Sequence, residues 1–284
     1  MLITEFHQFY KKKGLNQEVI NTFQTFIFSH FKQYGRDFPF RKEITPYNVL
    51  VSELMLQQTQ TNRVSEKFQK FIKKFPDFKS LDNAPLNEIL KLWQGLGYNR
   101  RAVALKNIAQ RVNNEFDEIL PADVEILKSF PQIGHNTASS IVAFAFNLPT
   151  FFIEVNIRRV FIYFFFPGKT SVDDRDIMPL VRKTLETANV RNWYYALMDY
   201  GVMLKKTHPE LTKRSAHYRK QSKFRGSNRE FRGKIIKLLI ERKLLTESEI
   251  IKELDIEPKK VESILNQLSQ EGFISRNKDG YFIA

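Results

Sequence analysis

The sequence predicts an all-α protein whose last part adds a short β-hairpin. Apolar residues recur at spacings of three and four in successive segments, and glycines or prolines separate those segments. No segment before the C-terminus shows the sustained alternation of a half-buried strand. The chain has 284 residues, 42% of them apolar, which is enough for two or three packed units.

The first helix is predicted from Asn16 to about Tyr34, where apolar residues fall on one face. The stretch after it, GRDFPFRKEITPY, contains a glycine and two prolines and is predicted to be a structured loop. A second helix is predicted from Tyr47 to about Asn62. Because this helix is apolar nearly all round, we expect it to be central, and it carries one charged residue in its middle, Glu53.

Further helices follow at short intervals. They are predicted around 63–74, 86–93, 100–115, 122–129 and 136–147, with Pro76, Gly95, Gly97 and Pro121 as separators. The run FIYFFFPG after Val160 is predicted to be buried, and helices at about 174–188 and 192–204 complete this part.

The last part has a different pattern. Helices are predicted at 229–243, 246–254 and 257–270, the second opened by a capping box, and 273–283 is predicted to be a hairpin. Three helices followed by a hairpin resemble a winged-helix domain. The helix at 257–270 is balanced in charge, so reading of DNA and contact with protein both stay open for it.

The net charge of +14 and the pI of about 9.7 favour a polyanionic partner. Nucleic acid is the first candidate, an anionic membrane surface the second, and a basic surface without a partner stays open. The chain has no cysteine, which excludes disulfides, thiolate nucleophiles and cysteine-held iron–sulfur sites. The N-terminus lacks the pattern of a signal peptide, and the longest apolar run is too short to span a bilayer, so we expect a cytoplasmic protein.

Two local features suggest contact with phosphates. The turn at Pro131–Gly134 precedes a helix that opens with small residues, so backbone N–H groups would point outward at a helix N-terminus. An ordinary corner between two helices would have the same spacing. The segment 205–225 holds eight Lys or Arg residues against one acid, and we expect an irregular basic arm there, with a solvated charged arm as the alternative.

Several motifs together resemble one known family. They are RDFPFR, PYNVLVSELMLQQTQ, APLNEILKLWQGLGYNRRA, the turn at Pro131–Ala138, IEVNIRRV and LMDYGVM, in collinear order over about residues 30–205. This pattern is similar to the helix-hairpin-helix (HhH-GPD) superfamily of base-excision DNA glycosylases, and it looks most like the MutY-type adenine glycosylases.

The resemblance implies a two-lobed helix-hairpin-helix core. One lobe would be discontinuous, formed by residues 1–45 and 149–228, and the other, with the hairpin, would be a helical barrel at 46–148. Residues 229–284 would form the winged-helix-like domain.

The resemblance also implies two catalytic acids. Glu53 matches the family's catalytic glutamate, which would protonate the departing base; a carboxyl group whose pKa is raised by burial can supply that proton at neutral pH. Glu154 stands where the family carries aspartate and would stabilise the cation formed at the sugar. A solvated helix glutamate is the alternative for Glu53, and a helix cap is the alternative for Glu154.

Lyase-type relatives resembling endonuclease III carry a Schiff-base lysine at the position of Asn136, so we expect base hydrolysis without efficient strand cleavage. Gln57, Gln58 and Tyr98 match positions that hold the duplex open around a flipped nucleotide, although Tyr98 could be core and the glutamines plain surface. Gln132 replaces the first glycine of the family's hairpin. The full set expected to contact DNA is Gln57, Gln58, Tyr98, Gln132, Gly134, His135, Asn136, Thr137, Asn156, Lys213, Arg214, Arg219 and Lys220.

The family usually carries four cysteines after the position of Met203, and here those positions hold Lys205, Thr212, Ser215 and Gln221. None can replace a thiolate on iron, so we expect no cofactor and no metal. The predicted function is monofunctional excision of adenine mispaired with guanine or 8-oxoguanine in double-stranded DNA, by a monomer. Removal of thymine or uracil opposite guanine is one alternative, and a catalytically inactive DNA-binding protein is another.

Overall fold

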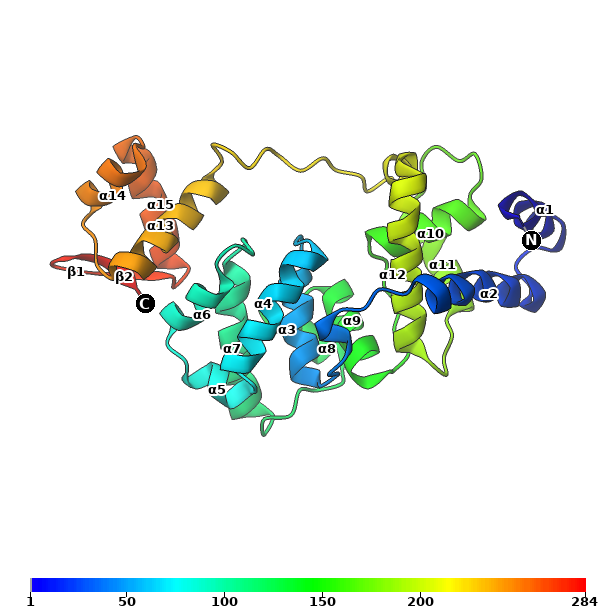
Figure 1. The fold of residues 1–284 in the computed structure, drawn as a ribbon, viewed down its shortest axis with the longest axis horizontal. Coiled ribbons are helices and arrows are strands. Elements are labelled where there is room, and N and C mark those ends of the chain that lie inside the picture. The colour runs from blue at the N-terminus through cyan, green and yellow to red at the C-terminus, as the bar shows by residue number, and fades with distance from the viewer. Residues whose placement is uncertain (1) are drawn as a thin grey trace. The chain divides into compact units, whose positions relative to one another are not determined.

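The structure is a computed structural model that describes residues 2–284, and it confirms a mostly helical chain (Figure 1). The chain forms two compact units. The first comprises the chain up to Ile44, with Ala122–Lys128 and Ile133–Lys220; the second comprises Thr45–Pro121, Ser129–Gln132 and Gln221–Ala284. No helix within the described part of the chain has the length and apolarity that crossing a membrane requires.

The first unit is built around aromatic side chains. Its elements are α1 (Ile3–Lys13), α2 (Gln17–Tyr34), η1 (Pro39–Arg41), α8 (Val124–Lys128), α9 (His135–Phe146), α10 (Val155–Phe165), α11 (Asp174–Thr184), α12 (Val190–Thr207) and η2 (Pro209–Arg214). The ring of Phe23 on α2 lies 4.9 Å from that of Phe164 and 5.7 Å from that of Trp193, centroid to centroid. Such tilted and edge-on pairs give this small unit a dense core.

Helices α10 and α12 pack against each other in this unit (Figure 1). Their closest approach is at Gly201, where a Cβ atom would lie 2.3 Å from the backbone oxygen of Asn156. Glycine is therefore required on α12 at this point, because any side chain would push the two helices apart.

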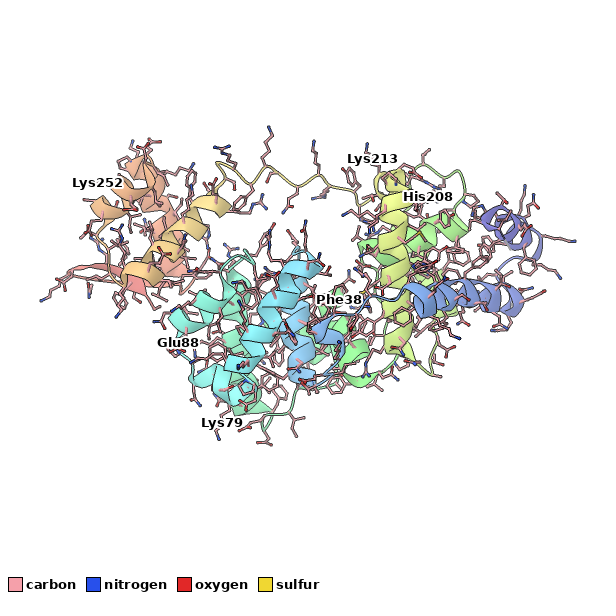
Figure 2. All side chains as sticks on the ribbon, in the orientation of Figure 1. Phe38, Lys79, Glu88, His208, Lys213 and Lys252 are labelled. Atoms are coloured by element: carbon pink, nitrogen blue, oxygen red, sulfur yellow. The ribbon has the colours of Figure 1, made fainter. Side chains whose placement is uncertain are left out.

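A buried ion pair joins α12 to the segment between α2 and η1. The carboxylate of Asp199 is 1% exposed and accepts from both Arg36 and Arg41 at 2.7–3.0 Å. Phe38, labelled in Figure 2, lies in the same segment, with both guanidinium groups over its ring. This arrangement fixes the path of the chain as it leaves α2.

The second unit combines two groups of elements, one within Thr45–Pro121 and the other within Gln221–Ala284. Its elements are α3 (Pro46–Leu56), α4 (Thr61–Lys74), α5 (Phe78–Asn83), α6 (Leu86–Trp93), α7 (Arg100–Glu115), α13 (Asn228–Arg242), α14 (Glu247–Leu254), α15 (Pro258–Gln270), β1 (Ile274–Asn277) and β2 (Gly280–Ile283). The strands are antiparallel, with Ile274 opposite Ile283 and Asn277 opposite Gly280. Glu271, just after α15, accepts from Arg232 of α13 and from Arg100 of α7, so the two groups are in contact.

The three C-terminal helices, the capping box at Thr246 and the hairpin are confirmed as elements. Their assignment to a winged-helix domain stays a prediction. So does the three-domain division, although the compact units group residues 133–148 with the first unit rather than with the barrel lobe expected at 46–148.

Three details of the predicted helices were wrong. The helix predicted at Tyr47–Asn62 ends at Leu56, and a separate helix starts at Thr61. The helices α1 and α5 were not predicted; α5 has only six residues, too few for a periodic pattern to show. The segment 205–225 is not wholly irregular, because α12 extends to Thr207 and η2 follows at Pro209–Arg214.

Candidate functional site

Glu53 lies in the last two turns of α3, a helix that is buried on nearly every side. Thr45 caps this helix by accepting from the backbone N–H of Asn48 at 3.1 Å, and Pro46 occupies its first position. Its neighbours in the chain, Ser52 and Leu54, are both buried, and Glu53 itself is half-buried. The structure thus excludes a fully solvated glutamate, while its catalytic role stays a prediction.

The end of α3 departs from the predicted helix because another side chain takes its last carbonyl groups. Gln57 has left the helix, and Gln58 has a φ of 54°, in the left-handed region. The guanidinium group of Arg101 fills the space after the helix. Its Nη1 donates to the backbone oxygens of Leu54, Met55 and Gln57 at 2.8, 2.9 and 2.6 Å.

The same guanidinium group holds the loop that carries Tyr98. Its Nη2 donates to Thr59 Oγ1, Leu96 O and Gly97 O at 3.1, 3.2 and 2.8 Å, and its Nε to Tyr98 O at 3.3 Å. Burial lowers the pKa of Arg101 to about 10, so it remains a cation at neutral pH. The sequence analysis missed this residue, although a charge within the apolar stripe formed with Leu105 and Ile108 of α7 was a usable signal.

Tyr98 lies at a loop tip and not in the core. Its φ is 47° and its side chain is 38% exposed. The hydroxyl group accepts from Arg229 Nη1 at 2.7 Å and contacts the amide of Gln221, which also lies 3.5 Å from Gln58 Oε1. The structure therefore brings Gln58 and Tyr98 onto one exposed face of the second unit.

In the turn before α9, Gln132 adopts a backbone conformation that favours glycine. Gln132 has a φ of 61°, and its carbonyl accepts from Gln57 Nε2 at 3.1 Å. Gly134 caps α9 without a side chain, and a Cβ atom there would meet nothing within 4 Å. The fold thus does not need glycine at 134, which leaves room for a ligand to approach the N-terminus of α9.

The first turn of α9 is tied to the segment that precedes α10. The ring nitrogen Nε2 of His135 donates to Phe151 O at 3.0 Å, and Asn136 Nδ2 donates to Ile153 O at 2.9 Å. His135 and Asn136 are exposed and Thr137 is half-buried. These contacts place the turn next to the residue before Glu154, within the first unit.

Glu154 is the N-cap of α10. Its Oε1 accepts from the backbone N–H groups of Asn156 and Ile157 at 2.7 and 2.8 Å, and its Oε2 accepts from Asn156 Nδ2 at 3.0 Å. Burial raises the pKa of Glu154 above its usual range, although these bonds and the charge of Arg159 act in the opposite direction. The capping role that the sequence left open is present, and the catalytic role stays a prediction.

Asn156 continues this network toward α12. Its Oδ1 accepts from Arg159 Nη1 at 2.6 Å, and the same nitrogen donates to Gly201 O at 3.1 Å. Arg159 Nε donates to Thr212 Oγ1 at 2.8 Å. This series of mostly part-buried hydrogen bonds connects Glu154 to Thr212 in the basic segment.

The cations expected to contact DNA divide into two kinds. Lys213, Arg219 and Lys220 are exposed, and Figure 2 labels Lys213 beside the end of α12. Arg214 instead donates to the backbone oxygens of Phe166 and Lys169, and burial lowers its pKa. Arg214 therefore holds the segment onto the first unit, and its predicted contact with DNA would compete with these bonds.

The residues at the family's cysteine positions do not fit an iron–sulfur cluster. The hydroxyl group of Thr212 accepts from Arg159, and that of Ser215 accepts from the backbone N–H of His217. Gln221 lies in the other unit and contacts Tyr98. These hydroxyl and amide groups are poor iron ligands, and hydrogen bonds already engage them.

Comparison with known proteins identifies a matching family. Residues 51–185 match the HhH-GPD superfamily of base excision DNA repair proteins. The chain is 34% identical over 183 residues to the adenine DNA glycosylase of Buchnera aphidicola subsp. Baizongia pistaciae, which covers 63% of this chain and 51% of that protein. It is 27% identical over 279 residues to the adenine DNA glycosylase of Mycolicibacterium smegmatis, covering 90% and 94%.

The chain spans about half the length of the first curated relatives it matches. Among solved structures, it resembles a thermostable thymine-DNA glycosylase with a TM-score of 0.57 at 24% identity, covering 65% of this chain and 86% of that one. It also resembles a trapped endonuclease III–DNA covalent intermediate with a TM-score of 0.53 at 15% identity, covering 74% and 91%. At these identities the two structures support the fold.

Proposed function

We propose that this chain, whose residues 51–185 match the HhH-GPD superfamily of base excision DNA repair proteins, excises mispaired adenine from double-stranded DNA. The proposed substrate is adenine opposite 8-oxoguanine or guanine. The observation that carries the proposal is the half-buried side chain of Glu53 on a mostly apolar helix, within the residues 51–185 that match the family. A positioned acid in such surroundings suits proton transfer to a leaving base.

In the proposed reaction, Glu53 protonates the adenine as the N-glycosidic bond breaks, because an adenine anion is a poor leaving group. The sugar becomes a cation, and the carboxylate of Glu154 stabilises it by its charge. Water then adds to the sugar carbon and releases a proton, which restores the carboxyl group of Glu53. Adenine and an abasic site are the products.

The reaction should stop at the abasic site. Asn136 stands at the position of the Schiff-base lysine of lyase-type relatives, and an amide nitrogen cannot form the imine. Its side chain is also bound to Ile153 O. We therefore expect a monofunctional hydrolase without efficient strand cleavage.

The proposed partner is duplex DNA, gripped through backbone N–H groups at the turn before α9 and through the exposed cations Lys213, Arg219 and Lys220. The net charge of +14 supports that partner. We propose a monomer that works without an iron–sulfur cluster, in the cytoplasm and on the nucleoid if the source is prokaryotic.

Two other functions remain as candidates. The fold likeness to a thymine-DNA glycosylase keeps removal of thymine or uracil opposite guanine as a second enzyme function. The use of Glu154 as a helix cap keeps a DNA-binding protein without catalysis as a different class.

One assay separates these functions. The protein is incubated with duplexes that carry A:8-oxoG, A:G, T:G or U:G, and the strands are resolved with and without alkali. Cleavage of the adenine strand only after alkali supports the proposal, whereas cleavage without alkali shows lyase activity. If every duplex stays intact while binding is retained, the protein is not a glycosylase for these bases.

A further inference from the structure

We propose that Arg101 is a positioning residue for base extrusion: it holds the end of the helix that carries Glu53 and the two loops that carry Gln57, Gln58 and Tyr98 in one arrangement. This inference rests on the proposed function for its substrate. It concerns contacts within the second unit only. Arg101 itself is 2% exposed and would touch neither DNA nor base.

The geometry joins two segments that are far apart in the sequence. Seven oxygen atoms accept from the guanidinium group of Arg101, four on residues 54–59 and three on residues 96–98. A guanidinium group has five N–H bonds in a rigid plane, so seven acceptors require shared hydrogens and closely fixed positions. The rings of Trp93 and Tyr98 lie 5.5 Å from the guanidinium carbon and confine the group further.

These contacts also account for how α3 ends. The last carbonyl groups of a helix have no partner within the helix. Here the backbone carbonyls of Leu54 and Met55 accept from the cation of Arg101 at the negative end of the helix. Glu53 precedes these two residues directly, so the position of the acid depends on the same contact.

The segments held by Arg101 contain strained backbone at the candidate DNA contacts. Gln58 and Tyr98 both adopt left-handed conformations, with φ of 54° and 47°. Residues other than glycine keep this conformation only where their surroundings impose it, and such strain gathers at functional sites. The bonds from Arg101 to Gln57 O and Tyr98 O are next to these two strained positions.

Thr59 gives a milder way to weaken the same unit. Its hydroxyl group accepts from Arg101 Nη2 at 3.1 Å and lies 3.2 Å from Leu96 O. Replacement by valine removes the hydroxyl group and preserves the shape of the side chain. Lysine at 101 keeps the charge but offers three donors from one nitrogen, which cannot reach both segments in the same way.

The test compares Arg101→Lys, Thr59→Val and the parent. Three quantities are measured: affinity for an unmodified duplex, the fluorescence gain of 2-aminopurine opposite guanine as it leaves the base stack, and the single-turnover rate of adenine excision opposite 8-oxoguanine. Arg41→Lys serves as the control, because Arg41 is also an arginine whose side chain is only 10% exposed, but it belongs to the other unit and pairs with Asp199. Circular dichroism gives the folded fraction of each variant.

We expect Arg101→Lys to keep the affinity for unmodified DNA within about threefold, since phosphate contacts dominate it. The fluorescence gain should be lost and the excision rate should fall about 100-fold, the effect of a small misplacement of reacting groups. Thr59→Val should also lower the fluorescence gain and the excision rate, but by less than Arg101→Lys does. Arg41→Lys should lower thermal stability. Its fluorescence gain and its excision rate should match those of the parent once they are corrected for the folded fraction.

The proposal is overturned if the folded Arg101→Lys variant has the fluorescence gain and the excision rate of the parent. It is also overturned if Arg41→Lys loses the fluorescence gain and the excision rate to the same extent as Arg101→Lys. If Arg101→Lys does not fold, Thr59→Val decides the question. A parent that extrudes 2-aminopurine without excising adenine would refute the proposed function alone, and the fluorescence comparison would still test Arg101. A parent that does not extrude 2-aminopurine refutes the role of Arg101.

Discussion

The two candidate acids occupy different positions in their helices. Glu53 is half-buried in the second half of α3, where most of the other residues are buried and apolar. Glu154 is held by two backbone N–H groups and one side-chain amide at the start of α10. The first environment suits a group that gives up a proton, whereas the second suits a fixed negative charge beside a developing cation.

The proton donor can be tested at Glu53. Replacement by glutamine keeps the size of the side chain but removes the acidic proton. We expect Glu53→Gln to abolish excision of adenine, measured in single-turnover assays, while affinity for the mispaired duplex changes by less than about threefold. Retained turnover would show that another group protonates the base.

The charge and the capping role of Glu154 can be separated. Glu154→Asp keeps a charged residue that caps helices well, whereas Glu154→Gln keeps an oxygen for the backbone N–H groups but loses the charge. We expect the aspartate variant to excise adenine within about tenfold of the parent and the glutamine variant to be slower by about 100-fold. Equal rates for parent and glutamine variant would mean that Glu154 only caps α10. Thermal unfolding of both variants reports the cap independently.

Gln132 should cost stability because it occupies a glycine conformation. A left-handed residue other than glycine is strained, and Gln132 has a φ of 61°. We expect Gln132→Gly to raise the free energy of unfolding by about 0.5–1 kcal/mol. Gln132→Ala, which removes the side chain but keeps the strain, is the matched control. A stabilisation of the same size in both variants would place the cause in the side chain instead.

Among the elements, the contact of α12 with its neighbours organises the first unit. Gly201 lets α10 approach closely, and Asp199, two residues earlier, binds Arg36 and Arg41 from the segment after α2. Burial alone would raise the pKa of Asp199, but the hydrogen bonds and charges of Arg41 and Arg36 hold it below its usual range. One helix therefore positions both the Glu154 network and the loop that leads to η1.

The linkage of Asp199 to stability has a defined sign. Because its pKa is lower in the folded protein than in the unfolded chain, its contribution is present above about pH 4 and is lost as the pH falls through the folded-state pKa. We expect Asp199→Asn to lower the free energy of unfolding at pH 7 by about 3 kcal/mol, since two partly buried cations lose the buried counter-charge that they share. The variant should also show less loss of stability on acidification below about pH 4, measured by urea unfolding at each pH.

The exposed pair of Asp176 with Lys169 provides the control for that experiment. Asp176→Asn removes an acid from a surface ion pair, where solvent screens the charges, and should change stability by less than about 0.5 kcal/mol. If Asp176→Asn and Asp199→Asn change the free energy of unfolding by the same amount, the burial of Asp199 is not the reason for its effect on stability.

For the whole molecule, the net charge should govern the proposed encounter with DNA. The net charge of +14 should make binding to unmodified duplex weaken steeply with salt, because each phosphate contact releases counterions. Arg214 adds its charge to this attraction but is less free to contact a phosphate directly, since it binds backbone oxygens of its own unit.

Two triple variants separate the contribution of the basic segment to DNA affinity from the contribution of the net charge. Lys213→Ala, Arg219→Ala and Lys220→Ala together should lower the slope of log affinity against log salt by about 2 to 3. The control replaces the exposed Lys11, Lys12 and Lys13 of α1 by alanine, which removes the same charge elsewhere. We expect a much smaller change in slope from the control. Equal salt slopes for the two triple variants would show that the net charge, and not this segment, accounts for binding to the DNA backbone.

The sequence by itself determined most of the helices, the absence of thiolate ligands and the presence of one acid within an apolar helix. Each of these depends on residue type or on periodicity within one segment. The tertiary structure decided where α3 ends, that Arg101 holds two segments together, that Glu154 caps α10 and that Arg214 faces inward. Three of these outcomes depend on contacts between residues 40 or more positions apart, as between Arg101 and Leu54 or Arg214 and Phe166, and the cap of α10 depends on which way one side chain turns. Periodicity within a segment cannot show such contacts, because packing alone brings a carbonyl group and its donor together.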